Sequence, residues 1–236
     1  MKGVIMAGGR GSRLMPLTNH IPKPLVPILD KPVMWYIVKL LKRAGIEDVV
    51  VTLGYLGDEI EKAFGDGSAL GVRLTYVRED KPLGTAGGVK NAQAYLDEDF
   101  VVVSGDAYTD FDLAGLIDYH YQKGGLVTLA AYTVDDASRF GVIVADENGL
   151  VRSFQEKPVH PLSRTVNTGI YVCDRRLLHL IPDGTVDFAK DVFPRLLGNI
   201  YAKECDGFWS DIGTLPTYYQ TNLQVVTGRK IAADLL

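Results

Sequence analysis

Short apolar runs alternate with stretches of helical spacing through the first half of the chain, and this alternation restricts the possible folds more than any other feature. Turn residues bound each apolar run, as is typical of strands, and the runs begin at Gly3, Asp48, Val72, Phe100 and Leu126. Stretches with helical spacing begin at Val33, Leu56, Gly84 and Leu113. Because runs this apolar need cover on both faces, the pattern predicts an α/β fold with a mostly parallel, Rossmann-like central sheet and helices on both of its faces.

The pattern changes after about Tyr132. The stretch from Gly141 to Lys157 is typical of two alternating strands, and the Asn148-Gly149 pair between them favours a tight turn. We therefore expect a small antiparallel hairpin inserted into the α/β fold. The sequence contains no internal repeat, low-complexity tract or linker, which predicts one continuous domain over residues 1–236.

Composition and charge argue against several classes of protein. A net charge of -4 does not suit a nucleic-acid surface, which needs clustered Lys and Arg. No apolar run approaches the length of a membrane span. The N-terminal apolar run, Val4 to Ala7, is too short for the core of a signal peptide. Cys173 and Cys205 lie far apart, without a metal-binding pattern, so we expect both to be reduced and structural. The prediction is a cytoplasmic protein with neither a nucleic-acid nor a membrane partner.

A glycine-rich loop, Met6 to Arg13, follows the first apolar run. Glycines let backbone amides approach phosphate oxygens, and Arg13 adds a fixed positive charge, so the loop predicts a cradle for a nucleoside triphosphate. It matches neither the GxxxxGK[ST] loop nor the GxGxxG dinucleotide motif. A tight turn would explain the glycines alone equally well. Lys23 favours the functional interpretation, because Pro22 and Pro24 stiffen the backbone on both of its sides.

The segment GGRGSRLMPLTNHIPKPLVPI resembles the GxGxRLxPLTxxxPKPxxPI signature of the sugar-nucleotide pyrophosphorylases, enzymes that join a nucleoside triphosphate to a sugar 1-phosphate. The resemblance continues through PLGTAG, SGD, FQEKP, VNTGIY and GFWSDIG, and only the last several residues lie outside it. It implies that residues 1–132 mainly bind the nucleotide and residues 133–236 mainly bind the sugar phosphate. The nucleotide contacts expected from the loop and the resemblance are Ala7, Gly8, Gly9, Gly11, Ser12, Arg13, Glu79, Gly84 and Thr85.

The implied reaction brings a dianionic sugar phosphate against the α-phosphorus of a triphosphate, so charge repulsion is the main obstacle. The attacking phosphate oxygen, with a second pKa of about 6, is already ionised at neutral pH, and no general base is required. The catalytic roles are therefore expected to be charge stabilisation by Arg13, Lys23 and Asp106.

Two aspartates are candidate ligands for Mg²⁺, which takes oxygen ligands and usually one or two carboxylates. Asp106 follows the strand from Phe100, and Asp211 lies in a late loop, so both are expected at the carboxyl edge of the sheet. In the resembled family the matching aspartates hold the metal. A strand-end cap and a turn residue would explain each aspartate singly, but they explain the two together less well.

The sugar site is implied mainly by the resemblance. A surface ion pair is the usual explanation for adjacent residues such as Glu156 and Lys157. By resemblance, Lys157 binds the phosphate of the sugar, Glu156 binds its hydroxyls, and Asn167 is a further sugar contact. Gly141 matches a position where the backbone approaches the sugar.

Two features bear on the base. The segment Leu83 to Gly87 opens a helix, where free amides and small residues favour the approach of a nucleobase or ribose. Glu79 stands where thymidylyl- and uridylyltransferases of the resembled family commonly carry glutamine. A carboxylate only accepts hydrogen bonds, which suits the two adjacent donors of guanine and would repel pyrimidine carbonyls. On chemistry alone, Glu79 as a plain strand end is an equal alternative.

The whole set of motifs resembles most closely the bacterial mannose-1-phosphate guanylyltransferases, which implies transfer from GTP to mannose 1-phosphate with Mg²⁺. The first alternative is a glucose-1-phosphate uridylyl- or thymidylyltransferase. The second is a non-catalytic sugar-nucleotide sensor, which would be expected to have lost Arg13, Lys23, Asp106 or Asp211. A dehydrogenase is disfavoured because no helix directly follows the glycines. Loops of the resembled family often pair subunits, so the resemblance is compatible with a homo-oligomer.

Overall fold

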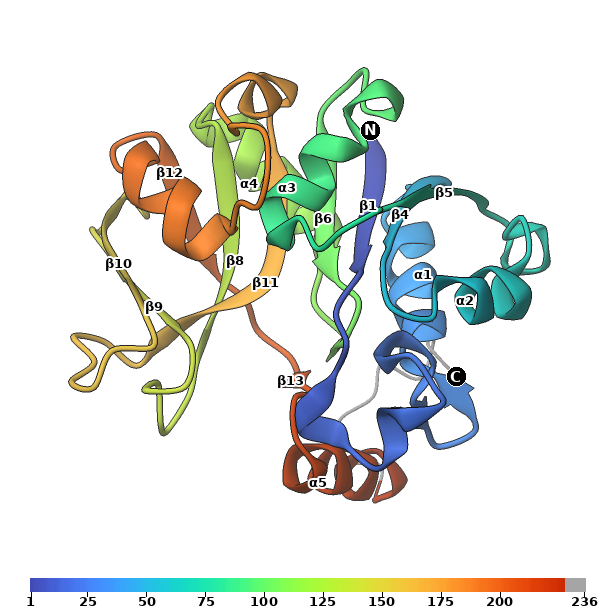
Figure 1. The fold of residues 1–236 in the computed structure, drawn as a ribbon. Coiled ribbons are helices and arrows are strands. Elements are labelled where there is room, and N and C mark those ends of the chain that lie inside the picture. The colour runs from blue at the N-terminus through green and yellow to red at the C-terminus, as the bar shows by residue number, and fades with distance from the viewer. Residues whose placement is uncertain (228–236) are drawn as a thin grey trace. The chain divides into compact units, whose positions relative to one another are not determined.

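A computed structural model describes residues 1–227 of the chain (Figure 1). These residues form two compact units that interleave along the sequence. Unit 1 comprises Met1–Pro82, Val103–Phe111 and the described residues from Gly207 onward, and unit 2 comprises Leu83–Val102 and Asp112–Asp206. The boundary at residue 132 that the family resemblance implies falls inside unit 2.

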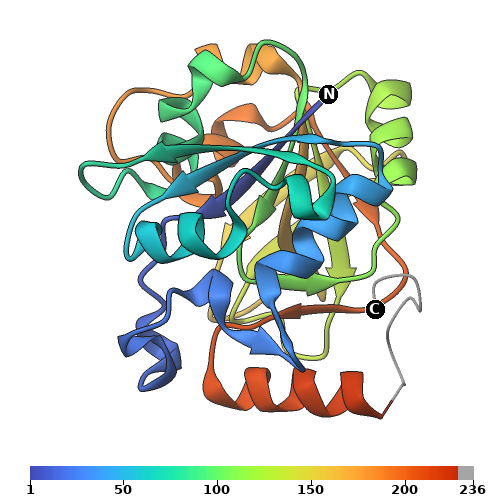
Figure 2. The ribbon, with the colours of Figure 1, turned by 90° about the vertical axis from the view of Figure 1, so that its right-hand side faces the viewer.

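Three parallel strands form the framework of unit 1. β1 (Lys2–Ala7) pairs with β4 (Asp48–Leu53), and β4 pairs with β5 (Arg73–Arg78). Strand residues of β1 and β4 are almost fully buried, as expected for a sheet covered by helices. α1 (Val33–Arg43) and α2 (Gly57–Phe64) lie on the side of unit 1 that faces the viewer in Figure 2.

Smaller elements complete unit 1. β7 (Ala107–Thr109) pairs with β13 (Trp209–Asp211), and β2 (Pro27–Ile28) pairs with β3 (Lys31–Pro32), both antiparallel. α5 (Leu215–Val226) follows β13. The remaining elements of unit 1 are short 3-10 turns: η1 (Ser12–Leu14), η2 (Leu17–Asn19), η3 (Lys23–Leu25) and η4 (Ser68–Leu70).

Aromatic side chains hold these smaller elements together. Tyr108 of β7 contacts Tyr36 of α1 and Phe208 edge-on, with ring centroids 5.0 and 5.9 Å apart. The Tyr36 hydroxyl donates a hydrogen bond to the carbonyl of Ile28, at 2.9 Å. Such aromatic pairs contribute roughly 0.5 to 1.5 kcal/mol each beyond their buried area. The segment that contains β7 is therefore fixed against α1 and against the residue before β13.

Unit 2 contains a curved, mixed sheet. β11 (Thr165–Cys173) is antiparallel to β8 (Val127–Thr133) and β9 (Gly141–Ala145), β9 is antiparallel to β10 (Val151–Glu156), and β12 (Ile200–Glu204) is parallel to β8. The helices are α3 (Gly84–Asn91) and α4 (Leu113–Lys123). Short helical turns are η5 (Gln93–Tyr95), η6 (Arg175–His179), η7 (Phe188–Val192) and η8 (Phe193–Leu196).

The strand β6 (Phe100–Ser104) is divided between the two units. The predicted α/β class, with a mostly parallel sheet and an antiparallel hairpin insert, is confirmed, and β9 and β10 are the two strands of the hairpin. Both cysteines are free thiols, as predicted. Within residues 1–227, no helix combines the length and the apolar character needed to cross a bilayer.

Candidate active site

Three of the predicted site residues meet in unit 1. The Lys23 ammonium forms an ion pair with Asp106 and lies 3.6 Å from Oδ1 of Asp211. Lys23 and Asp106 are 83 residues apart in sequence, yet their side chains are only 12% and 22% exposed. The structure therefore brings together one lysine and both predicted metal-binding aspartates.

Strand pairing places the two carboxylates side by side. Asp106 precedes β7. The expected loop position of Asp211 is wrong, since Asp211 ends the strand β13 and pairs with Ala107 in the ladder. The amide of Ile212 donates to the carbonyl of Asp106, at 3.2 Å. The Ser104 hydroxyl donates to Oδ1 of Asp106, at 2.5 Å. The sequence analysis did not identify Ser104 as a partner of this carboxylate, although the SGD motif contains it.

Gly105 allows the backbone to approach β1 at this point. Its amide donates to the carbonyl of Met6, and a Cβ on Gly105 would lie only 2.6 Å from that oxygen. Any larger residue would therefore separate the Asp106 segment from β1. The requirement for glycine in the SGD motif is steric.

Lys23 is fixed beside the glycine loop, as the flanking prolines predicted. It begins η3, and both Pro22 and Pro24 are buried. Gly11 has φ +65°, in the left-handed region, and a Cβ there would lie 3.2 Å from Cβ of Lys23. The Thr18 hydroxyl donates to the Gly11 carbonyl, at 2.8 Å. The loop and the lysine are thus parts of one local structure.

The charges in this cluster shift the pKa values of its members. Burial raises the pKa of Asp106, but attraction to Lys23 outweighs it and lowers that pKa to about 2. Burial and repulsion from Asp106 raise the pKa of Asp211 to about 6, against the attraction of Lys23 and Arg13. For Lys23, burial lowers the pKa, but the two carboxylates together raise it by more, so that the net shift is upward. Asp106 and Lys23 are therefore charged at neutral pH. The ionised form of Asp211 is disfavoured relative to that of an ordinary aspartate.

Arg13 lies within electrostatic range of the cluster. Its side chain is exposed on η1, and its charge acts on Lys23 and Asp211, opposing the charged form of the lysine and favouring the ionised form of the aspartate. Two cations and two carboxylates therefore gather at one end of the glycine loop. Such a cluster suits a ligand that brings both anionic oxygens and a counter-cation.

The carboxylate pair fits Mg²⁺. Carboxylate oxygens are the ligands that Mg²⁺ prefers, and it commonly takes one or two of them together with substrate phosphates and water. Burial and the neighbouring charge of Asp106 raise the pKa of Asp211, and a bound divalent cation would oppose both effects. Among residues 1–227, no group of three or more His, Cys, Asp and Glu side chains could hold a metal. The remaining ligands would have to come from substrate and water.

Glu79 lies against the glycine loop. It follows β5, and its Oε1 is 3.2 Å from the position a Cβ would take on Gly8. Gly54 approaches the same glycine from β4, since a Cβ on Gly54 would lie 2.5 Å from the Gly8 carbonyl oxygen. The Arg10 guanidinium stacks over the Tyr55 ring, 5.2 Å from its centroid. The sequence analysis missed Gly54 and Tyr55, although their place directly after a strand parallel to β1 was a usable signal.

Gly84 and Thr85 lie in unit 2, at the start of α3. A Cβ on Gly84, which has φ +74°, would lie 2.5 Å from the carbonyl oxygen of Val186. The Thr85 hydroxyl donates to Asp187, at 3.1 Å, and accepts from the amide of Phe188, at 2.9 Å.

The expectation of free amides at this helix start is wrong for two residues. The amides of Ala86 and Gly87 both donate to the Val186 carbonyl, at 3.0 Å. A loop that is distant in sequence caps the helix, and sequence spacing could not reveal this. Close approach of a ligand here would therefore rest on Gly84 and on the exposed side of Thr85.

Three of the predicted sugar-site residues form a group in unit 2. Gly141 pairs with Glu156 across the hairpin, and a Cβ on Gly141 would lie 3.1 Å from Oε2 of Glu156. The Lys157 ammonium lies 3.1 Å from Oε1 of Glu156, and the Lys157 amide donates to the carbonyl of Phe140. Lys157 has φ +48°, an unfavourable conformation for a residue with a side chain, and such strain concentrates at functional sites.

Asn167, the fourth residue, lies on β11 and is oriented by two hydrogen bonds. Its Nδ2 donates to the Tyr171 hydroxyl, at 3.1 Å, and its Oδ1 accepts from the Gly169 amide, at 3.2 Å. Burial raises the pKa of Tyr171, and its hydrogen bond with Asn167 opposes that shift. Tyr171 ends the VNTGIY motif, but the sequence analysis did not identify it as the partner of Asn167.

Comparisons with known proteins find similar sequences. The family model described as nucleotidyl transferase matches residues 2–228. A UTP–glucose-1-phosphate uridylyltransferase of Synechocystis is 39% identical over 98% of this chain and 64% of its own length. A mannose-1-phosphate guanylyltransferase of Mycobacterium tuberculosis is 37% identical over 95% of this chain and 64% of its own length. The chain thus spans slightly less than two thirds of these curated relatives.

Solved structures are similar as well. The structure of HddC from Yersinia pseudotuberculosis complexed with GMP-PN has a TM-score of 0.83 and 28% sequence identity. The match covers 95% of this chain and 99% of that one.

We expect Asp211→Asn to raise the free energy of unfolding at pH 8 in metal-free buffer. An acid whose pKa is higher in the folded than in the unfolded state destabilises the fold when ionised. For Asp211 this penalty is fully present above about pH 6 and disappears below the unfolded value of about 3.9. The gain should be on the order of 1 kcal/mol at pH 8 and smaller at pH 5, as measured by urea unfolding.

Asp106→Asn is the matched control. The lowered pKa of Asp106 means that its ionised form stabilises the fold above the unfolded value, and this contribution is lost as the pH falls through about 2. This variant should therefore be less stable than the wild type at pH 8. A loss of stability in both variants would contradict the charge imbalance described for the cluster.

Proposed function

Because the chain belongs to the nucleotidyl transferase family, we propose that it transfers a nucleotidyl group from GTP to mannose 1-phosphate, giving GDP-mannose and pyrophosphate. The observation that carries the proposal is the cluster of Lys23, Asp106 and Asp211 beside the glycine loop. It combines cations for phosphates with carboxylates for a divalent metal ion. A transferase of the same family with another base and another sugar would be expected to use the same cluster.

In the proposed mechanism, an ionised oxygen of the sugar phosphate attacks the α-phosphorus in line, and pyrophosphate leaves. Lys23 and Arg13 offset the negative charge on the reacting phosphates, and Lys23 is pre-positioned because two carboxylates already hold it. Asp106 and Asp211 would hold Mg²⁺, which when bound neutralises further charge on the phosphate oxygens. No side chain needs to remove a proton.

The glycine loop is the proposed triphosphate site. Its backbone, with the side chains of Ser12 and Arg13, would surround the phosphates. In unit 2, Gly84 and Thr85 are proposed as further nucleotide contacts. The proposed nucleotide contacts in the loop are Ala7, Gly8, Gly9, Gly11, Ser12 and Arg13. On the sugar side, Lys157 would bind the phosphate, Glu156 and Asn167 the hydroxyls, and Gly141 would give room for the sugar ring.

The choice of GTP rests on Glu79. Its carboxylate lies against Gly8, at the loop proposed to hold the nucleotide, where it would accept from the two adjacent donors of guanine. The Mycobacterium relative is a guanylyltransferase and HddC was solved with GMP-PN, which supports the same base. The Synechocystis relative supports a second candidate, glucose-1-phosphate uridylyl transfer. The cytoplasmic location, the homo-oligomer and the absence of nucleic-acid and membrane partners also stay proposals.

The deciding experiment is pyrophosphate release with Mg²⁺ from GTP, UTP, dTTP, ATP and CTP, each paired with mannose 1-phosphate and with glucose 1-phosphate. We expect the highest kcat/KM with GTP and mannose 1-phosphate, and no release after Mg²⁺ is removed by a chelator. A maximum with UTP or dTTP and glucose 1-phosphate would replace the proposed substrates and leave the mechanism in place. No pyrophosphate release with any pair would instead support the non-catalytic sensor.

Arg13→Ala should lower kcat by about 100- to 1,000-fold, the range typical for removing one group that stabilises transition-state charge. Arg10→Ala is a matched control, because Arg10 is exposed in the same loop and stacks on Tyr55. It should lower kcat by less than about tenfold, that is less than about 1.4 kcal/mol. Equal losses in the two variants would show that loop packing, and not the Arg13 charge, is what matters.

Glu79→Gln should reduce the preference for GTP over UTP by about tenfold in kcat/KM, the size expected for one hydrogen bond to a charged group. The melting temperature should not change, because Glu79 lies outside the core. Glu59→Gln on α2 is the matched control, since Glu59 is exposed and distant in sequence from the loop. If Glu79→Gln leaves the GTP/UTP ratio as it is in the wild type, Glu79 does not read the base.

A further inference from the structure

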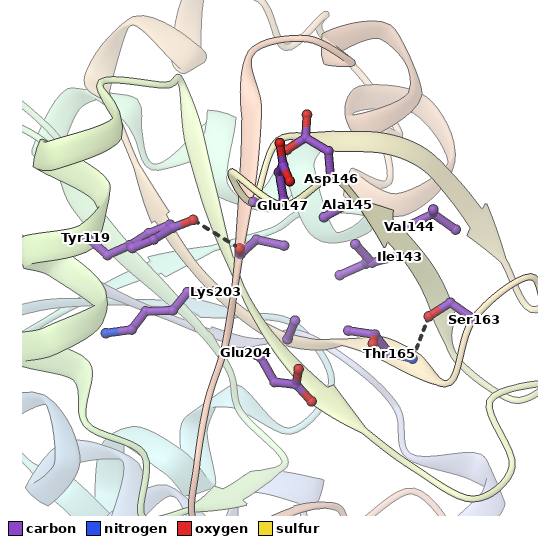
Figure 3. Close-up of a pocket in the computed structure, with 13 residues that line it drawn as sticks. Tyr119, Ile143, Val144, Ala145, Asp146, Glu147, Ser163, Thr165, Lys203 and Glu204 are labelled. Atoms are coloured by element: carbon purple, nitrogen blue, oxygen red, sulfur yellow. Dashed lines mark hydrogen bonds between the residues drawn. The ribbon is translucent and has the colours of Figure 1, made fainter.

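Unit 2 contains a cavity of about 390 Å³ (Figure 3), and its lining residues do not include those proposed to bind the sugar. Its floor is apolar and formed by small or branched side chains: Ala131 of β8, Ile143 of β9 and Ala202 of β12. Tyr119 of α4 forms one wall. The alanines matter, because larger side chains at these positions would fill the space.

Oxygen acceptors form another part of the cavity lining, which we call the rim. Glu204, Glu147, Ser163 and Thr165 form it, and Glu204 already accepts from the Thr133 hydroxyl, at 2.6 Å. The rim is therefore acidic and hydroxylated, so it would repel a phosphate and favour groups that donate hydrogen bonds.

The one lysine at the cavity does not offset this charge. The ammonium of Lys203 donates to the carbonyl of Gly115, at 2.6 Å, and Figure 3 shows it directed toward α4. A ligand in the cavity would meet the aliphatic part of this side chain and not its charge. The cavity is thus suited to a neutral group with an apolar side.

Strand register relates the cavity to the proposed sugar site. Ala131 pairs with Asn167 on one side and with Glu204 on the other, and paired residues of neighbouring strands point to the same face. Asn167, Ala131 and Glu204 therefore form one row on the sheet, with neighbouring strands about 4.8 Å apart. Ile143 lies two residues from Gly141, about 6.6 Å along β9 and on the same face.

We propose that the cavity is a subsite for a neutral, hydrogen-bond-donating substituent on the sugar, so that the protein also accepts sugar 1-phosphates larger than a plain hexose. The sugar ring would lie at Asn167 and Gly141, and the substituent would cross Ala131 toward Glu204 and Thr165. Its apolar part would rest on Ala131, Ile143 and Ala202, and its hydroxyl or amide would donate to the rim. The inference rests on the proposed function, since it extends the same sugar site.

The test compares matched pairs of substrates in the wild type and in Ala202→Leu, which fills the cavity. The pairs are N-acetylglucosamine 1-phosphate with glucose 1-phosphate, and a heptose 1-phosphate with mannose 1-phosphate. We expect Ala202→Leu to lower the extended-to-parent ratio of kcat/KM by about tenfold or more for at least one pair. Ala114→Leu, the same change on the exposed side of α4, should alter both ratios by less than about twofold.

Saturation-transfer NMR on N-acetylglucosamine 1-phosphate gives a readout that needs no turnover. Transfer to the acetyl methyl should be seen in the wild type and lost in Ala202→Leu. If hexose 1-phosphates react but neither the ratios nor the transfer responds to Ala202→Leu, the subsite is refuted and the proposed function stands. If no sugar 1-phosphate reacts, the proposed function fails, and loss of transfer in Ala202→Leu alone would still support the cavity as a binding site.

Discussion

The charged cluster of unit 1 is centred on the ion pair between Lys23 and Asp106, with Asp211 beside it. Two carboxylates lie at one buried ammonium, and Arg13, the second cation, is exposed. Burial and Asp106 raise the pKa of Asp211 to about 6, so the attraction of Lys23 and Arg13 does not fully offset them. Such an arrangement contributes little to stability, because apolar residues of similar size would avoid the free-energy cost of desolvating the charges. The imbalance is better explained by a ligand that brings a cation with it, as a metal-bound triphosphate does.

Close backbone contacts hold the cluster in place, and they explain several glycines at once. Gly105 touches the Met6 carbonyl and Gly54 touches the Gly8 carbonyl, each at a distance that excludes a Cβ. Strands β1, β4 and β6 therefore present their ends to the glycine loop without side chains in between. The contact of Gly105 also places the neighbouring Asp106 beside β1.

Sequence patterns indicate candidate residues better than the contacts among them. Lys23, Asp106 and Asp211 each have a motif or a position at a strand end, and the structure brings the three together. The occupied amides of Ala86 and Gly87 were not foreseen, since the capping residue Val186 is distant in sequence. The contact of Tyr171 with Asn167 was not foreseen for a different reason. Residues four apart are well separated along a regular strand, and here β11 is irregular between the two. Pairwise contacts of this kind depend on tertiary packing, which local periodicity does not encode.

The polar groups of unit 2 follow a different rule from the charged cluster of unit 1. Its donors are largely satisfied internally: Asn167 donates to Tyr171, Lys203 to Gly115, and Thr168 to Ala130. Oxygen acceptors, above all the carboxylates of Glu156 and Glu204, remain near the surface of the sheet. A ligand held by such a surface must itself supply hydrogen-bond donors, and hydroxyl groups are the donors that sugars offer in greatest number. Lys157 is an exception, because it adds a cation directly after the last residue of β10 and has a strained backbone. This cation would bind the phosphate of the proposed sugar phosphate.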